Sequence, residues 1–421
     1  MTEKTDPYAA LRLGPYRLFI SGRGIFFIGM HMQSTAIGWQ IYERFGTMLS
    51  LAYIGLVQIV PILFLALPAG HLADRFNRKV IILLALGLFT IASSCLAYLS
   101  HTHGDARLIY LFLFLLGVAR SFAIPSISAL LPNVIPRSVW ANANTWNSTM
   151  FELASMTGPA LAGGIIAATG GATAVYLLAA SGALSCLALF SFLHPIQELA
   201  NKQAATFQDV IGGLRFMFRT KLLLGAASLD LFAVLLGGAT TLLPVVAKDI
   251  LHVGPEGFGL LRAAPSVGAV TMALITAHRP PWQRSGRVLF LAFVGFGLAT
   301  IVFGLSRNFW LSMSMLAFTG MFDNLNVVIR QTLVQFITPD TMRGRVTSVN
   351  FIFIGCSNEL GGFESGLTAQ LFGTVPSIVG GGVGTILVVL VIMKLCPPLR
   401  KLGRMQDVQA APAEAVIARP A

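Results

Sequence analysis

The segment "GHLADRFNRKVII", from Gly70 to Ile82, places a dense group of charges between two long apolar stretches. Its charged residues fall within six positions: Asp74, Arg75, Arg78 and Lys79. The flanking stretches, 51–73 and 80–99, carry at most one charge over about 20 residues, which at 1.5 Å per residue crosses a hydrocarbon core about 30 Å thick. We therefore interpret the segment as a charged turn between two membrane-spanning helices.

The composition extends this interpretation to the whole chain. Of 421 residues, 55% are hydrophobic and 11% are charged, whereas about a quarter of the residues in soluble domains are charged. This excludes an ordinary soluble protein. The net charge of +12 would suggest nucleic acid binding in a soluble protein, but here the basic residues gather in loops and termini, so we expect no nucleic acid partner. The four cysteines show no CxxC spacing, and we expect no metal or other cofactor.

Apolar length and turn signals predict an all-α integral membrane protein with twelve transmembrane helices. Their expected positions are 17–43, 49–73, 79–100, 107–131, 140–169, 173–193, 222–247, 256–278, 287–306, 308–335, 344–371 and 375–396. With the N-terminus in the cytoplasm, 21 Lys and Arg residues lie on the cytoplasmic side and four on the other. This distribution follows the positive-inside rule. No cleavable signal peptide is evident, and we expect both termini to be cytoplasmic.

An internal repeat predicts two pseudo-symmetric six-helix halves. "IPRSVWANANTWN", 135–147, aligns without gaps with "TPDTMRGRVTSVN", 338–350. Such copies indicate a parallel repeat about an axis along the membrane normal. The expected organisation is a first half at 1–193, a cytoplasmic linker at 194–221, a second half at 222–396 and a cytoplasmic tail at 397–421. Within the linker, helical spacing of apolar residues predicts an amphipathic helix on the membrane surface or, equally, a solvated linker helix.

The opening segment resembles the signature loop of the major facilitator superfamily, roughly G-x-L-a-D-r-x-G-r-K/R. Asn77 stands where that signature has glycine, and asparagine tolerates a left-handed turn better than most residues. The stretches "GVARSFAIPSISALLPNVIP", "GPALAGG", "GGLRFMFRTK" and "PDTMRGRV" are similar to the bacterial efflux branch that includes the enterobactin exporter. The resemblance covers about residues 15 to 400. It implies a secondary transporter that works by alternating access.

The same resemblance implies a gate at the charged loop. Asp74 would meet the start of the eleventh span, where Arg343 and Arg345 stand and where a helix dipole favours an anion. The contact would hold the two halves together on the cytoplasmic side and break when that side opens. The alternative is a charge cluster that only fixes topology. The predicted gating residues are Gly70, Asp74, Arg75, Arg78, Lys79, Arg343 and Arg345.

Ionisable residues inside the membrane are costly and mark substrate pathways or proton relays. The candidates are His31, Arg120, Glu152, Asp230, Asp323, Asn326, Arg330, Glu359 and Glu364. Arg120 and Asp323 occupy equivalent repeat positions with opposite charge, so we expect them to pair at the centre of a cavity, either as a coupling pair or as a permanent structural pair. For Glu152, Glu359, Glu364 or His31 taken alone, an interhelical hydrogen bond is the favoured explanation over proton coupling, but we expect at least one of the set to couple protons.

"GPALAGG" resembles the span-five motif of antiporters, G-P-x-x-G-G, with one additional residue before the glycine pair. The motif residues are Gly158, Pro159, Gly163 and Gly164. Glycines let helices approach closely and flex where two halves move against each other. The motif suggests antiport, although tight helix packing alone would use the same residues.

These observations favour proton-coupled export of a small amphipathic molecule of the drug or siderophore class from a bacterial inner membrane. Uptake or lipid flipping on the same fold is the main alternative. An enzyme is not expected, since no HExxH or GxSxG motif occurs, and a primary pump is not expected because no GK dipeptide occurs. The expected partners are the substrate, protons and the lipid bilayer, with the protein as a monomer.

Overall fold

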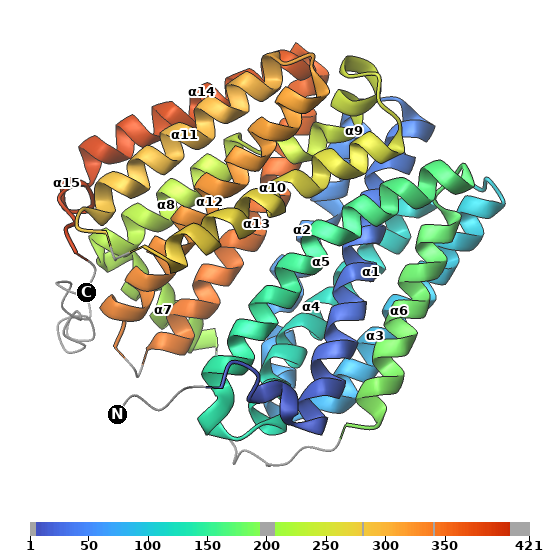
Figure 1. The fold of residues 1–421 in the computed structure, drawn as a ribbon, viewed down its shortest axis with the longest axis horizontal. Helices are drawn as coiled ribbons and strands as arrows, with labels where there is room; N and C mark the ends of the chain where they lie inside the picture. Colours follow the sequence, from blue (N-terminus) through green and yellow to red (C-terminus); the bar gives the residue numbers. More distant parts are fainter. Residues whose placement is uncertain (1–5, 194–206, 280–281, 340–341, 405–421) are drawn as a thin grey trace. The chain divides into compact units, whose positions relative to one another are not determined.

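The computed structural model describes residues 6–193, 207–279, 282–339 and 342–404, and within them the chain forms helices and no strand (Figure 1). The helices are α1 (Gly14–Phe45), α2 (Met48–Arg75), α3 (Arg78–His101), α4 (Leu108–Val134), α5 (Trp140–Thr169), α6 (Thr173–Ser191), α7 (Phe207–Arg219), α8 (Lys221–Leu236), α9 (Leu243–Val245), α10 (Pro255–Ala277), α11 (Ser285–Leu305), α12 (Phe309–Ile337), α13 (Arg343–Phe372), α14 (Thr374–Leu395) and α15 (Pro397–Arg400).

The all-α membrane fold is confirmed, but the count of twelve spans is not. Among the described residues, nine helices are long and apolar enough to cross a membrane. The three expected spans outside this set form the long helices α1, α12 and α13. These helices carry ionisable residues such as His31, Asp323 and Glu359 in their middle turns, which lowers their apolar content. The polar helices are therefore also the ones that hold many of the candidate site residues.

The expected span over 222–247 is found, since the run Lys221–Ile250 is long and apolar enough to cross a membrane, but it is not one continuous α-helix. Helix α8 ends at Leu236, and the chain continues through a 3-10 turn at Ala239–Leu242, the short α9 and a π-helical turn at Val246–Ile250. The break falls on the pair Gly237 and Gly238, and glycine has a low helix propensity. A side chain at Gly237 would also meet Phe296 Cε1 at 2.5 Å. Close packing therefore requires glycine at the point where the helix ends.

The chain divides into two compact units. Unit 1 comprises 1–45, 60–204 and 254–263, and unit 2 comprises 46–59, 205–253 and 264–421. Helices α2 and α10 each begin in one unit and continue in the other. Each unit therefore contains a short segment from the opposite half of the sequence.

The core of unit 1 combines aromatic packing with a fully bonded polar network. Its largest fully buried side chains include Phe19, Phe26, Phe89 and Phe190. Beside them, Tyr176 Oη donates to Gln40 Oε1 (2.7 Å), and Gln40 Nε2 donates to Ser100 Oγ (2.8 Å). Buried polar groups need such partners because water cannot reach them. The network holds α6, α1 and α3 in register.

In unit 2, helix α7 packs into the core along one face. Phe216 and Met217 are fully buried among residues of α8, α11, α12 and α13, and a side chain at Gly213 would lie 2.7 Å from the backbone oxygen of Arg345. Ile211 and Phe218 remain exposed. Sequence reasoning predicted a surface-bound or a solvated helix, whereas half of the observed helix is a core element. Tight contact with α13 through Gly213 explains the difference.

Candidate functional site

The basic residues of the charged loop cap neighbouring helices of unit 1. Arg78 Nη1 donates to the carbonyl of Ala129 (2.9 Å) and to Asn133 Oδ1 (3.1 Å), near the end of α4. Lys79 Nζ donates to the carbonyls of Ser191 (2.6 Å) and Leu193 (3.0 Å), at the end of α6. Cations are stabilised at helix C-termini because the last carbonyls lack intrahelical partners. Both residues thus fix the loop to α4 and α6.

Asn77 has a different role from the one expected for it. Its φ is −62°, outside the left-handed region, and its side chain accepts a hydrogen bond from the backbone N–H of Lys79 (3.0 Å). Asparagine is a favoured N-cap because its oxygen satisfies a free N–H of the first turn. The residue that replaces the signature glycine therefore starts α3.

For four of the predicted gating residues, including the acid Asp74, the structure describes the backbone and not the side chain. Gly70, Asp74 and Arg75 belong to the last turns of α2, and Arg343 begins α13. The exposed Arg345 follows in the first turn of α13, where its backbone packs against α7. The contact of Asp74 with the start of α13 stays a prediction.

A buried polar cluster lies in unit 2 and joins α8, α12 and α13. Asp230 Oδ2 forms an ion pair with Arg330 Nη2 at 3.4 Å, and Asp230 Oδ1 accepts a hydrogen bond from Asn326 Nδ2 at 2.6 Å. Arg330 Nη1 donates to Asn350 Oδ1 at 2.6 Å. Asp230 is 5% exposed and Arg330 is 3% exposed. Each charge is neutralised by its partner and bonded by an amide, as a buried ion pair requires.

Sequence reasoning found three of these four residues and missed Asn350 as a site residue. Its signal was present in the repeat, which aligns Asn147 with Asn350. The repeat position of Arg330 in the first half is Ile127. Correspondingly, the buried side-chain amide of Asn147 has no hydrogen-bond partner within the described residues. The ion pair is thus a feature of one repeat copy.

The other acidic candidates of unit 2 are partly buried. Glu364 Oε2 accepts from Ser365 Oγ at 3.4 Å, and Glu359 lies one and a half turns earlier on α13. Asp323 lies on α12, seven residues before Arg330. Arg120 belongs to unit 1 and Asp323 to unit 2, so the expected pairing of the two stays a prediction.

In unit 1, basic residues follow one side of α1. The guanidinium of Arg23 lies 5.0 Å from the centre of the Phe27 ring, and the His31 ring lies 5.7 Å from that of Phe151. Farther along α1, Ser34 Oγ accepts a hydrogen bond from Arg262 Nη2 of α10 at 3.0 Å. Within the described part of the chain, Arg23 Nε and His31 Nε2 are buried and have no hydrogen-bond partner.

Two further candidates of unit 1 are Arg120 and Glu152. Arg120 of α4 and Arg262 are close enough to His31 to interact with it electrostatically. Glu152 follows Phe151 on α5 and is partly buried. We call Arg23, His31, Arg120, Glu152 and Arg262 the unit 1 polar cluster. Arg23 and Arg262 were not among the residues predicted from the sequence, although each is a charged residue inside a long helix, which was the available signal.

The antiporter-like motif on α5 brings two neighbouring helices close. A side chain at Gly158 would lie 2.7 Å from His31 Cβ, so α5 packs directly on α1. A side chain at Gly163 would collide with the carbonyl of Pro255 and lie 2.9 Å from Gly259 Cα, so α5 also packs on the start of α10. By contrast, a side chain at Gly164 would meet nothing within 4 Å. Tight packing therefore requires Gly158 and Gly163.

A related contact occurs within unit 2. A side chain at Gly55 of α2 would collide with the carbonyl of Glu359, and one at Gly366 would lie 2.7 Å from Ala52 Cβ. Leu49 N also donates to Gln370 Oε1 at 3.3 Å. The start of α2 thus packs on the end of α13, as the start of α10 packs on the end of α5.

Comparisons with known proteins agree with this architecture. A family model described as transmembrane secretion effector matches residues 5–417. The enterobactin exporter of Citrobacter koseri (strain ATCC BAA-895 / CDC 4225-83 / SGSC4696) is 28% identical over 334 residues, covering 79% of this chain and 80% of that protein. The enterobactin exporter of Escherichia coli O1:K1 / APEC is 26% identical with the same coverage.

Solved structures show the same fold at low identity. The nucleoside transporter NupG superposes with a TM-score of 0.70 at 13% identity, covering 90% of this chain and 99% of that one. A bacterial homolog of the human lysosomal transporter Spinster gives a TM-score of 0.69 at 15% identity, covering 97% and 100%.

Proposed function

The chain belongs to the transmembrane secretion effector family, within the major facilitator superfamily, and is a multi-pass membrane transporter of a small molecule. We propose that it exports an amphipathic molecule with acidic groups in exchange for protons. The relatives named as enterobactin exporters support export of a siderophore-like compound. The proposed location is a bacterial inner membrane, with both termini in the cytoplasm and the protein as a monomer.

The charge balance of the unit 1 polar cluster carries the proposal. Away from the helix ends, the described spans of this unit hold three arginines, Arg23, Arg120 and Arg262, and a single acid, Glu152. Whichever pairs form, positive charge is in excess. Arg23 and Ser34, the partner of Arg262, are eleven residues apart on α1, or about 16 Å along the axis. Because uncompensated charge inside a membrane is costly, an acidic substrate that passes along α1 would supply the missing negative charge.

Unit 2 has the opposite balance and is the proposed site of proton coupling. Its interior holds Asp230, Asp323, Glu359 and Glu364 against Arg330. Asp230 is held by its ion pair with Arg330, and the proposed proton carriers are the partly buried Asp323, Glu359 and Glu364. A carboxyl group that gains a proton when water leaves, and loses it when a cation approaches, can couple proton movement to a conformational step.

In the proposed orientation, the contacts of α5 with α10 and of α2 with α13 lie at the outer ends of these helices. Each joins segments from opposite halves of the sequence. Alternating access requires such contacts to form and separate in turn. The proposed counterpart on the cytoplasmic side is the contact of Asp74 with the start of α13.

Transport by purified protein in proteoliposomes with an imposed pH gradient tests the function. We expect a siderophore that carries carboxylate groups to be transported and to dissipate the gradient, reported by a pH-sensitive dye. Replacing Asp323 with asparagine should leave siderophore binding in place and abolish the proton signal. Unchanged transport after collapse of the gradient would contradict proton coupling. Movement of a fluorescent lysolipid, with no siderophore transport, would instead support lipid flipping.

Neutralising the unit 1 polar cluster tests the substrate class. Replacing Arg262 or Arg23 with glutamine should raise KM for an acidic substrate about tenfold, because a hydrogen bond to a charged group contributes about 1.5–3 kcal/mol. The KM for the neutral ester of the same compound should not change. The matched control is Arg44→Gln, because Arg44 Nη1 bonds the carbonyl of Gly104 at the helix end. Equal losses for the acid and its ester would contradict an acidic substrate.

A further inference from the structure

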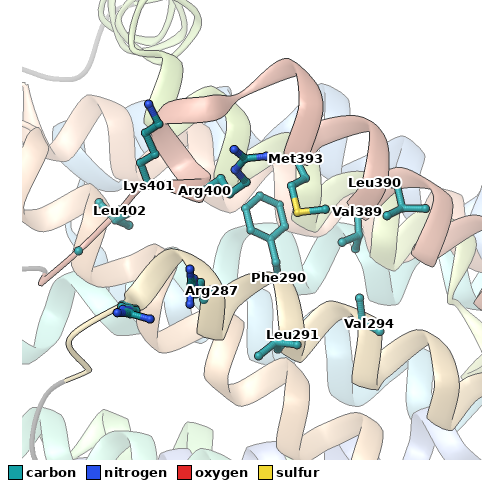
Figure 2. A pocket seen from close by; sticks show the side chains of 12 residues that line it. Arg287, Phe290, Leu291, Val294, Val389, Leu390, Met393, Arg400, Lys401 and Leu402 are labelled. Carbon is teal, nitrogen blue, oxygen red and sulfur yellow. The ribbon is translucent and has the colours of Figure 1, made fainter.

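A groove on unit 2 combines a basic end with an apolar wall (Figure 2). It lies between α11 and α14, extends to α15 and encloses about 710 Å³. Its basic residues are Arg284, Arg287, Arg400 and Lys401, and none of the residues that line it is acidic. In Figure 2, Arg287, Arg400 and Lys401 lie toward one end of the groove, Val294 and Leu390 lie toward the other, and Leu291 lies between them.

The basic end is held by backbone contacts between distant segments. Ser285 N donates to the carbonyl of Gly403 (3.1 Å), and Gly286 N donates to that of Leu402 (3.2 Å). Leu399 is fully buried in the unit 2 core, and a side chain at Gly286 would collide with its carbonyl. These contacts attach the residues after α14 to the first turn of α11. The four cations are therefore presented together by a fixed backbone.

The cations themselves are exposed, and no hydrogen bond or ion pair is found between their side chains and other residues that the structure describes. Four like charges around one groove repel each other unless an anion joins them. Arginine is suited to phosphate because its planar group donates two parallel hydrogen bonds. The basic end thus matches a phosphate-bearing ligand.

The apolar wall indicates that this ligand also carries hydrocarbon. Leu291 is 68% exposed and Leu390 is 45% exposed, and both line the groove together with Phe290 and Met393. Between their ends, α11 and α14 contain no charged residue. Helices of this kind face lipid, whereas the more polar helices α12 and α13 carry the partly buried acids Asp323, Glu359 and Glu364. A free phosphate ion would leave the apolar wall unoccupied.

We propose that this groove binds an anionic phospholipid of the adjacent leaflet, with its phosphate between Arg284, Arg287, Arg400 and Lys401 and an acyl chain along Leu291 and Leu390. Basic pockets where helices leave a membrane are suited to such headgroups. With the proposed orientation of the chain, the leaflet is the cytoplasmic one. The lipid is distinct from the exported substrate, since neither the unit 1 polar cluster nor the buried acids of unit 2 contribute to the groove.

Native mass spectrometry of the full-length protein, released from nanodiscs of phosphatidylcholine with added phosphatidylglycerol, tests the proposal. We expect phosphatidylglycerol to be retained in preference to phosphatidylcholine. The variant Arg284→Gln/Arg287→Gln/Arg400→Gln/Lys401→Gln should lose at least tenfold in retained phosphatidylglycerol, since each cation near a membrane surface contributes about fivefold to anionic lipid binding.

The matched control neutralises four exposed cations outside the groove: Arg17→Gln, Arg215→Gln, Lys221→Gln and Arg279→Gln. It carries the same net charge as the groove variant and should retain phosphatidylglycerol like the unmodified protein. If both variants lose phosphatidylglycerol equally, lipid retention depends on net charge alone, and the proposal is overturned.

A second comparison separates lipid from phosphate. The variant Leu291→Gln/Leu390→Gln keeps all four cations and should also lose phosphatidylglycerol, and added inorganic phosphate should not displace the lipid from the unmodified protein. Displacement by phosphate, with no loss in the leucine variant, would identify a phosphate site and overturn the lipid proposal. Because none of these measurements uses transport, their outcome is independent of the proposed export function.

Discussion

Replacing Arg330 with leucine is expected to lower the free energy of unfolding by about 3–5 kcal/mol, because removing one partner leaves a buried charge without compensation. The charge left behind is Asp230, which is 5% exposed and retains a single hydrogen bond, from Asn326. Asn350 would also lose the donor to its side-chain oxygen. Unfolding of the purified protein in mixed micelles with a rising fraction of dodecyl sulfate measures the loss.

The double variant Asp230→Asn/Arg330→Leu provides the decisive comparison. It removes both charges and keeps an amide beside Asn326, so it should recover more than half of the lost stability. A surface control, Lys394→Leu, should change stability by less than about 0.5 kcal/mol. If the single and double variants unfold at the same dodecyl sulfate fraction, the cost does not come from an unpaired carboxylate. The buried cluster would then contribute through packing alone.

The fold could be predicted from the sequence because membrane-spanning helices are determined by local composition. Apolar length located each helix, and the charged turn at 70–82 carried the family resemblance. The break after α8 could not be predicted from Gly237 and Gly238, because small residues such as glycine also occur inside continuous membrane helices. At the break, the two glycines are in close contact with distant residues such as Phe296 and Gly361. Contacts between segments far apart in sequence are absent from any local pattern.

The sequence predicted most of the residues that belong to the site, but it did not predict which of them pair with each other. A buried arginine needs an acid, and Arg330 had four candidates in its own half, Asp230, Asp323, Glu359 and Glu364. Hydrogen-bond geometry between α8 and α12 selects Asp230, and a sequence contains no such geometry. Arg23 and Arg262 were not predicted as site residues, and the hydrogen bond from Arg262 to Ser34 joins helices far apart in sequence.

The glycines of α5 show why the position of a residue matters more than its match to a motif. Gly163 and Gly164 both belong to the antiporter-like stretch, yet only the first is pressed against α10. Its missing side chain makes room for the carbonyl of Pro255 and for Gly259. If α5 and α10 must approach this closely in one state of the transport cycle, a methyl group at Gly163 disfavours that state.

The variant Gly163→Ala should therefore reduce the transport rate about tenfold, since overpacking a close contact costs about 1–3 kcal/mol and about 1.4 kcal/mol corresponds to a factor of ten. Gly164→Ala is the matched control: it adds the same methyl group to the same helix, where nothing lies within 4 Å. It should transport normally and unfold no earlier than the unmodified protein, because alanine favours helix. Both variants are compared in the proteoliposome assay at equal reconstituted protein. Equal transport by the two would show that the approach of α5 to α10 is not part of the cycle, and that Gly163 serves packing alone.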